Sequence, residues 1–313
     1  MKRWHGVLGV MLCLAMQTVF ARELDYHLTP RKVAPDVWVL EGANADFAPA
    51  NGCNIINTGF IDTGDGVIVI NTGPSALYGE QQRQAIGQVT SAPVKWVFNL
   101  NLHPDYFFGN QAYADVGAQA LAGTIAGAQR EGAAYADNMY RICGNWLRNT
   151  EATPPSKPLT PGQRTFGRHR IDLIRLDGHT SDDLVVVDRT SGVVFAGGLA
   201  FRDRIPTTPH ADIGRWLASL EQLQKIVAES GAQVLIPSHG PAFGQADAIV
   251  QTRDYLHWLD ARMRRAADEG HDLAEVLAMP VEPEYAHWGG MPAEYVRNVT
   301  HFYPIYESAV LAR

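Results

Sequence analysis

The stretch VKWVFNLNLHPDYFFGN, residues 94–110, sets the fold class of this chain. Its first part, residues 94–100, is apolar and rich in β-branched and aromatic side chains, which predicts a buried strand. Polar residues follow at once, among them His103 and Asp105. Loops at the ends of strands carry binding and catalytic groups on a rigid scaffold. We therefore expect a functional site directly after this strand.

Three later stretches also follow apolar strands: GHTSDD (178–183), AGGL (196–199) and PSHGP (237–241). His179 and His239 thus stand in settings equivalent to that of His103. A lone histidine is most often an ordinary polar loop residue. Three of them at strand ends, flanked by Gly, Pro and Asp, favour one shared site. Imidazole and carboxylate are common zinc ligands, so a metal site is the expected chemistry. The candidate ligands are His103, Asp105, His179 and His239.

The rest of the chain predicts a layered α/β sandwich. Short strands precede an alanine-rich helix over residues 122–148, and strands resume after a proline-rich loop at 154–162. Residues 211–230 have apolar side chains at helical spacing, and the chain beyond residue 240 is mostly helical in pattern. Strands in both halves, each followed by helices, are typical of such a sandwich. The loop at 154–162 is expected to join two halves of one unit.

The first 21 residues predict a secretory signal peptide. Lys2 and Arg3 precede an apolar run, and small residues stand at the −3 and −1 positions before Arg22. We therefore expect residues 22–313 to be one exported domain with a helical C-terminal segment, located in the periplasm or secreted. Cleavage would leave Cys53 and Cys143 as the only cysteines. A disulfide is the expectation in an oxidising compartment, and two buried thiols are the alternative.

Composition excludes several classes of function. Hydrophobic residues make up 46% and charged residues 19% of the 313, which is a globular balance and not that of a disordered, collagenous or coiled-coil chain. The net charge of −7 offers no basic surface for nucleic acid. After signal cleavage we expect no membrane span and a small-molecule substrate.

Taken in order, the four stretches resemble the metallo-β-lactamase superfamily: a strand with an HxHxDH-type motif, GHT, a strand end that carries a bridging aspartate, and a late SHG. The closest resemblance is to the periplasmic quinoprotein relay system zinc metallohydrolases, on NLNLHPDYFFGN (99–110) and PTTPHADIGRW (206–216). The resemblance implies an αββα four-layer sandwich and zinc-dependent hydrolysis. It also implies a periplasmic partner, a dehydrogenase that depends on pyrroloquinoline quinone (PQQ).

The metal motif of this chain is incomplete. Asn101 and Tyr106 stand where the motif has histidine, and Gly198 stands at the bridging aspartate. An Asn amide is a weak zinc ligand, and a phenolate from Tyr106 would need a bound cation to form. We therefore expect at most one zinc per chain, or none. His210 is a further candidate, as a ligand or substrate contact, and the alternative is an ordinary helix-start residue.

These residues predict an exported hydrolase that cleaves an ester, thioester or related bond with a metal-activated water. Asp105 would orient that water or accept its proton, which makes it the candidate catalytic residue. The alternative is a catalytically weakened or non-enzymatic periplasmic accessory protein that binds a quinoprotein dehydrogenase. Activity on β-lactams is a third and weaker hypothesis, because the ligand positions are altered.

Overall fold

The computed structural model describes residues 24–244 and 247–312. The expected signal peptide lies outside this part of the chain. Among the described residues, the strands form one seven-stranded and one five-stranded sheet. The first sheet runs in the order β1 (Arg31–Ala34), β2 (Val37–Leu40), β3 (Thr58–Asp62), β4 (Val67–Ile70), β5 (Val94–Phe98), β6 (Gln119–Ala120), β7 (Lys157–Pro158). The second runs in the order β12 (Val234–Ile236), β11 (Val193–Phe195), β10 (Asp183–Asp188), β9 (His169–Leu176), β8 (Gly162–Phe166).

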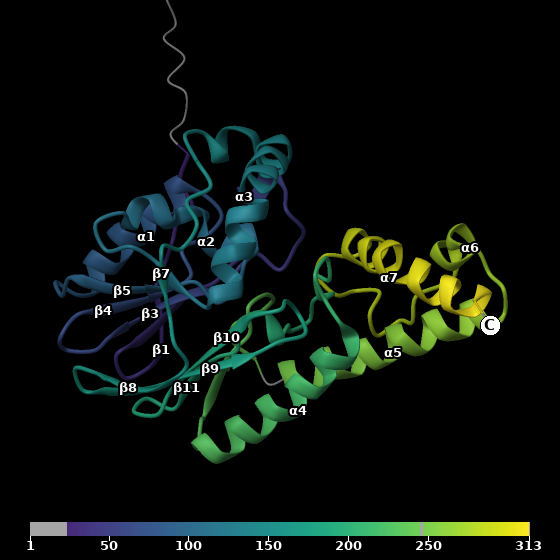
Figure 1. Ribbon diagram of the computed structural model, residues 1–313. Coiled ribbons are helices and arrows are strands. Elements are labelled where there is room, and N and C mark those ends of the chain that lie inside the picture. Colours follow the sequence, from purple (N-terminus) through teal and green to yellow (C-terminus); the bar gives the residue numbers. More distant parts are fainter. Residues whose placement is uncertain (1–23, 245–246, 313) are drawn as a thin grey trace, which may run out of the picture.

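Helices cover the outer faces of both sheets (Figure 1). Before the mid-chain loop come η1 (Pro49–Asn51), α1 (Ala76–Val89), α2 (Pro104–Phe107), η2 (Phe108–Tyr113), α3 (Ala122–Cys143) and η3 (Gly144–Leu147). After it come η4 (Gly197–Leu199), α4 (Ile213–Ser230), α5 (Ala248–Asp268), α6 (Leu273–Ala278) and α7 (Ala293–Leu311). No helix of the described residues combines the length and apolar character needed to cross a membrane.

The buried side chains show four layers. One apolar cluster fills the space between the two sheets and includes Ile68, Phe98, Ile171 and Val186. A second lies between the first sheet and α1, and a third between the second sheet and the helices α4, α5 and α7. This arrangement confirms the expected α/β sandwich with helices on both outer faces.

Local sequence explains where several elements begin and turn. Asp65 and Gly66 lie in the turn of residues 63–66 that joins the antiparallel strands β3 and β4, and an Asp-Gly pair is typical of such connections. The Asp212 side chain accepts a hydrogen bond from the Arg215 backbone N–H and begins α4, and Gly231 ends it in the left-handed conformation. Helix α1 was not expected, because its buried face is built from small and polar residues such as Gln82 and gives no clear apolar stripe.

Two connections shape the region around the strand ends. The proline-rich loop adds β7 to the edge of the first sheet and then enters β8 of the second sheet, so it joins the two sheets. A disulfide joins Cys53 to Cys143 across 90 residues, with Cα atoms 6.0 Å apart. It ties the loop before β3 to the end of α3, and the packing of Phe107 and Phe108 against this region buries it.

Candidate active site

The structure brings the four candidate ligands to one edge of the sandwich. The His103 and His179 rings lie 4.8 Å apart in an edge-to-face arrangement. Asp105 Oδ2 lies 2.7 Å from His239 Nε2. The His239 backbone forms bridges to Ile56 and Phe201, which fixes it between segments from both halves of the chain. The strand ends therefore converge as the sequence pattern predicts.

Asn101 shapes the turn that presents His103. Its Oδ1 accepts a hydrogen bond from the His103 backbone N–H at 2.9 Å. Pro104 then occupies the first position of α2, where a missing N–H costs nothing. Asn101 is fully buried, so its amide serves the protein's own hydrogen bonds.

His210 folds back against His103. Its Nδ1 lies 3.0 Å from His103 Nε2, and its Nε2 lies 2.7 Å from Glu131 Oε2 on α3. The Tyr135 hydroxyl donates to the same Glu131 oxygen at 2.6 Å. Sequence reasoning missed Glu131 and Tyr135. Their spacing of one helical turn on an alanine-rich helix was the available signal.

His179 is held by a carboxylate on one ring edge. Its Nδ1 lies 3.2 Å from Asp183 Oδ1, while the Asn101 amide nitrogen is more distant at 3.4 Å. Asp183 also accepts from the Thr180 backbone N–H. Because a carboxylate accepts, we place the His179 ring proton on Nδ1. Nε2 of His179 is buried and has no hydrogen-bond partner among the described residues.

Asp105 and His239 bond to one another. Both are almost fully buried, and His239 Nδ1 lies 2.9 Å from Ser238 Oγ. Burial lowers the pKa of His239 even though the Asp105 carboxylate opposes that change. The pair is therefore best described as a neutral imidazole whose Nε2–H donates to the Asp105 carboxylate.

Burial also keeps His103 and Tyr106 uncharged. The pKa of His103 is well below its usual value because of burial and because of the neighbouring His179, His210 and His239 rings. Burial, together with the nearby Asp105 carboxylate, raises the pKa of Tyr106 well above its usual value. The Tyr106 phenol is fully buried, so it stays protonated and is a poor candidate for a ligand.

Gly198 leaves no room for a bridging carboxylate. A Cβ atom at this position would lie 1.9 Å from His179 Nδ1 and 2.6 Å from Asn101 Nδ2. The His179 ring and the Asn101 amide therefore occupy the space that a side chain at position 198 would need.

The distances between these side chains can be compared with the geometry that zinc ligands require. Two ligands of one tetrahedral zinc, each about 2.0–2.1 Å from it, lie about 3.3 Å apart. Asp105 Oδ2 and His239 Nε2 lie only 2.7 Å apart. They are hydrogen-bonded to one another, which leaves no space for a metal ion between them. No group of three or more His, Cys, Asp or Glu side chains within residues 24–244 and 247–312 is arranged to hold a metal. The two-zinc set does not fit these contacts, and Nε2 of His179 is the ring nitrogen of the cluster that has no hydrogen-bond partner among the described residues.

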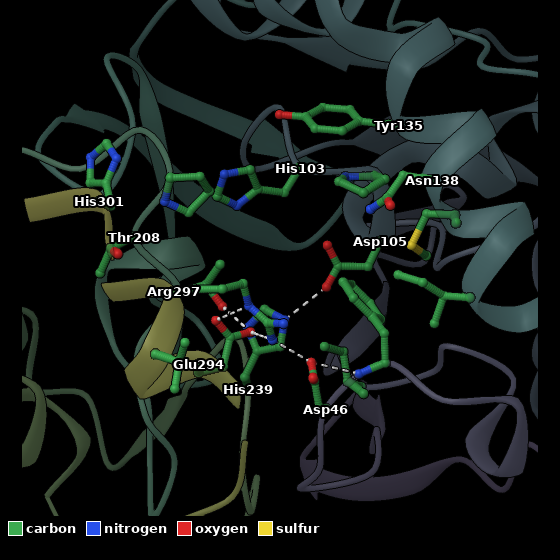
Figure 2. Close-up of a pocket in the computed structure, with 18 of the residues that line it drawn as sticks. Asp46, His103, Asp105, Tyr135, Asn138, Thr208, His239, Glu294, Arg297 and His301 are labelled. Carbon is green, nitrogen blue, oxygen red and sulfur yellow. Dashed lines mark hydrogen bonds and ion pairs between the residues drawn. The ribbon is translucent and has the colours of Figure 1, made fainter. Parts of the chain in front are cut away.

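A cavity of about 720 Å³ opens beside the histidine cluster (Figure 2). His103, Asp105 and His239 line its inner wall. Helix α3 supplies Tyr135, Met139 and Ile142 on one side, and α7 supplies Val296, Arg297, Thr300 and His301 on the other. The expected C-terminal helical segment thus forms part of the cavity, a role that its sequence pattern did not indicate.

Arg297 is the only arginine or lysine among the described residues that line this cavity. Its guanidinium lies 2.6 Å from Asp46 and 3.0 Å from Glu294, so both of its neighbours in the cavity wall are carboxylates. Glu294 also pairs with the buried Arg204 at 3.5 Å. The cavity therefore presents paired charges and an apolar lining.

Comparison with known proteins places the chain in a family. The family model of the Metallo-beta-lactamase superfamily matches residues 51–239. Among solved structures, a metallo-beta-lactamase from Pontibacter korlensis is 21% identical with a TM-score of 0.59, over 74% of this chain and 99% of that one. The metallo-beta-lactamase FIM-1 from Pseudomonas aeruginosa, solved in the mono-zinc form, is 20% identical with a TM-score of 0.57, over 74% and 95%. The comparison with curated proteins found no match.

The match runs from the disulfide cysteine region to His239 and so includes His103, Asp105, His179 and His239. The likeness to the solved structures supports the fold alone. Together with the two-sheet architecture and the convergent strand ends, the family match shows that this chain belongs to the metallo-β-lactamase superfamily.

Proposed function

We propose that the protein is an exported hydrolase that cleaves an uncharged ester, thioester or related acyl bond. One observation carries the proposal: His103, Asp105 and His239 line the inner wall of a cavity whose other walls are largely apolar. A concave, apolar site with a few convergent polar groups is the usual form of a small-molecule site.

The charges of the cavity favour an uncharged substrate. Arg297 is already paired with Asp46 and Glu294, and Asp105 adds a third carboxylate to the lining. An anionic substrate would have to compete with these carboxylates for one guanidinium. β-Lactam antibiotics carry a carboxylate, so activity on them is disfavoured by the same argument.

A single zinc, if bound, would be held by His103 and His179, and would polarise the substrate carbonyl and make water more acidic. Asp105 lines the cavity and is the carboxylate of the cluster best placed to hold the proton released by the attacking water. The hydrogen bond from His239 Nε2–H to Asp105 fixes the orientation of the Asp105 carboxylate. The apolar side chains of α3 and α7 would hold the acyl portion and exclude bulk water.

The compartment and the partner belong to the proposal as well. The predicted signal peptide and the Cys53–Cys143 disulfide support a periplasmic or secreted location. We propose a PQQ-dependent dehydrogenase as the periplasmic partner, on the sequence resemblance of residues 99–110 and 206–216.

A second candidate is a non-enzymatic accessory protein that binds such a dehydrogenase. The observation in its favour is the closure of the second metal position, where Asp105 and His239 bond to one another and position 198 has no room for a ligand. This protein would keep the fold and the cavity but not turnover.

A panel of uncharged acyl esters and thioesters, assayed with the zinc-loaded protein, separates the two candidates. Hydrolysis that needs His103 and ceases on chelation supports the hydrolase. Absence of turnover, together with co-purification of a quinoprotein dehydrogenase, supports the accessory protein and overturns the first proposal. A chromogenic cephalosporin serves as the anionic comparison substrate and is expected to show no turnover.

A further inference from the structure

Outside the histidine cluster, most polar side chains in the cavity wall are already bonded within the protein. Tyr135 donates to Glu131, and Arg297 is paired with two carboxylates. The three threonines of the wall each donate a hydroxyl hydrogen bond of 3.2 Å or less: Thr207 to Glu294, Thr208 to Asn298 and Thr300 to the Val296 carbonyl. These groups therefore have little capacity left for a ligand.

Asn138 and His301 differ from the other polar groups of the wall. Both line the cavity, and neither side chain has a hydrogen-bond or ion-pair partner within residues 24–244 and 247–312. Asn138 lies on α3 one turn from Tyr135 and Ile142, which line the same wall. His301 lies on α7, one turn from Arg297 (Figure 2). Each helical wall thus presents one hydrogen-bonding group that the described part of the protein does not use.

Both groups are uncharged, and both can donate as well as accept. The Asn138 amide has an NH₂ donor and a carbonyl acceptor. Partial burial, with His210 as a smaller cause, lowers the pKa of His301, so its imidazole is neutral at pH 7. A neutral imidazole has one N–H donor and one lone pair. A hydroxyl group, which also donates and accepts, is a small uncharged group that complements either residue.

An entirely apolar acyl chain would suit these two positions poorly. Solvent water satisfies Asn138 and His301 when no ligand is bound. A chain that displaces this water without replacing its hydrogen bonds loses affinity. A chain with a hydroxyl opposite either group restores a hydrogen bond and so binds more tightly.

We propose that Asn138 and His301 are specificity-determining residues that select an uncharged acyl substrate with a hydroxyl group on its acyl chain. The cavity of about 720 Å³ lies in the size range of pockets for drug-sized ligands, so it has room for such a chain. The inference rests on the proposed function for the reaction and concerns only which acyl chain is bound. The family match ends at His239, so selection by His301 is a property that the C-terminal helices add to the common fold.

Binding of amide analogues tests this selection without turnover. Calorimetry on the purified protein compares octanamide with hydroxyoctanamides that carry the hydroxyl at successive chain positions. A hydrogen bond contributes about 2–10-fold in affinity, so at least one hydroxyoctanamide should have a Kd lower than that of octanamide by this factor. The double variant Asn138→Leu/His301→Phe keeps the approximate shape of both side chains and should lose the preference. The two single variants show which helix supplies the hydrogen bond.

Asn145→Leu with His257→Phe is the matched control and should keep the preference. Both residues are exposed, and neither lines the cavity. Thermal unfolding shows whether each variant remains folded. If the double variant unfolds, the single variants provide the same test.

Three results would overturn the proposal: octanamide that binds the parent as tightly as every hydroxyoctanamide, no binding of any of these amides, or a preference that persists in the folded variants. Failure of the proposed hydrolase function would appear differently, as absence of turnover on acyl esters with the binding preference intact.

Discussion

The two halves of the histidine cluster are built differently. In the first half, His103 and His179 each place one ring nitrogen against a protein partner, and Nε2 of His179 has no partner within residues 24–244 and 247–312. In the second half, His239 Nε2 and Asp105 Oδ2 are hydrogen-bonded to one another. The first half is therefore prepared to bind, whereas the second is prepared to hold and orient a carboxylate.

The sequence resemblance places Asn101 and Gly198 at ligand positions of the family motif, and neither is available to a metal in this structure. The Asn101 amide oxygen accepts a hydrogen bond in the turn that presents His103. The His179 ring lies where a side chain at position 198 would extend. The remaining groups of the second half then close into a hydrogen-bonded pair. We expect one half to bind a metal and the other to supply the acid–base group.

The substitution Asp105→Asn, in the second half of the cluster, should cause the largest loss of activity. The amide keeps the shape of the side chain but no longer holds a proton from water, and loss of a general base costs about 10²–10⁴-fold in rate. Zinc binding at His103 and His179 should persist. The measurement is kcat/KM on an uncharged ester together with the zinc content. A rate within about threefold of the parent would show that Asp105 is not the base.

Removal of the disulfide should have the next largest effect. Cys53→Ser with Cys143→Ser releases the end of α3, the helix that carries Glu131, and should lower the free energy of unfolding by about 2–5 kcal/mol. Urea unfolding measures this change. Comparison of the oxidised and reduced parent protein provides the control. Because α3 lies on the His103 side of the cluster, we expect that side to loosen more than the Asp105–His239 pair.

Gly198→Asp tests whether the bridge can be restored. The added side chain would force the His179 ring to move, so we expect a loss of about 1–3 kcal/mol in stability and no second zinc. Gly87→Ala is the matched control, since a Cβ atom there meets nothing within 4 Å. A stable Gly198→Asp variant that binds two zinc ions would contradict this account of the second half.

The smallest expected effect concerns the cavity wall. Ile142→Ala removes apolar surface from the α3 side and should reduce kcat/KM for a long acyl ester by about tenfold. A short acetyl ester should be affected less, which makes it the internal control. Equal losses on both substrates would show that Ile142 does not contact the acyl portion.

Much of the fold could be predicted from the sequence because apolar runs and turn pairs act locally. The strand at residues 67–70 and the helix ended by Gly231 are examples. The helix at 76–89 could not, since its polar buried face is satisfied only by tertiary hydrogen bonds such as those of Gln82. The convergence of the four strand-end residues followed from the pattern. Glu131 could not be predicted, because its link to His210 spans 79 residues and depends on packing.

The zinc content of the purified, zinc-supplemented protein tests the central claim most directly. Native mass spectrometry of the parent and of His103→Ala, His179→Ala and His239→Ala gives the count per chain. We predict one zinc in the parent and in His239→Ala, and none in His103→Ala or His179→Ala. Two zinc ions in the parent, none at all, or a single ion lost with His239 would contradict the claim that only one half of the cluster binds metal.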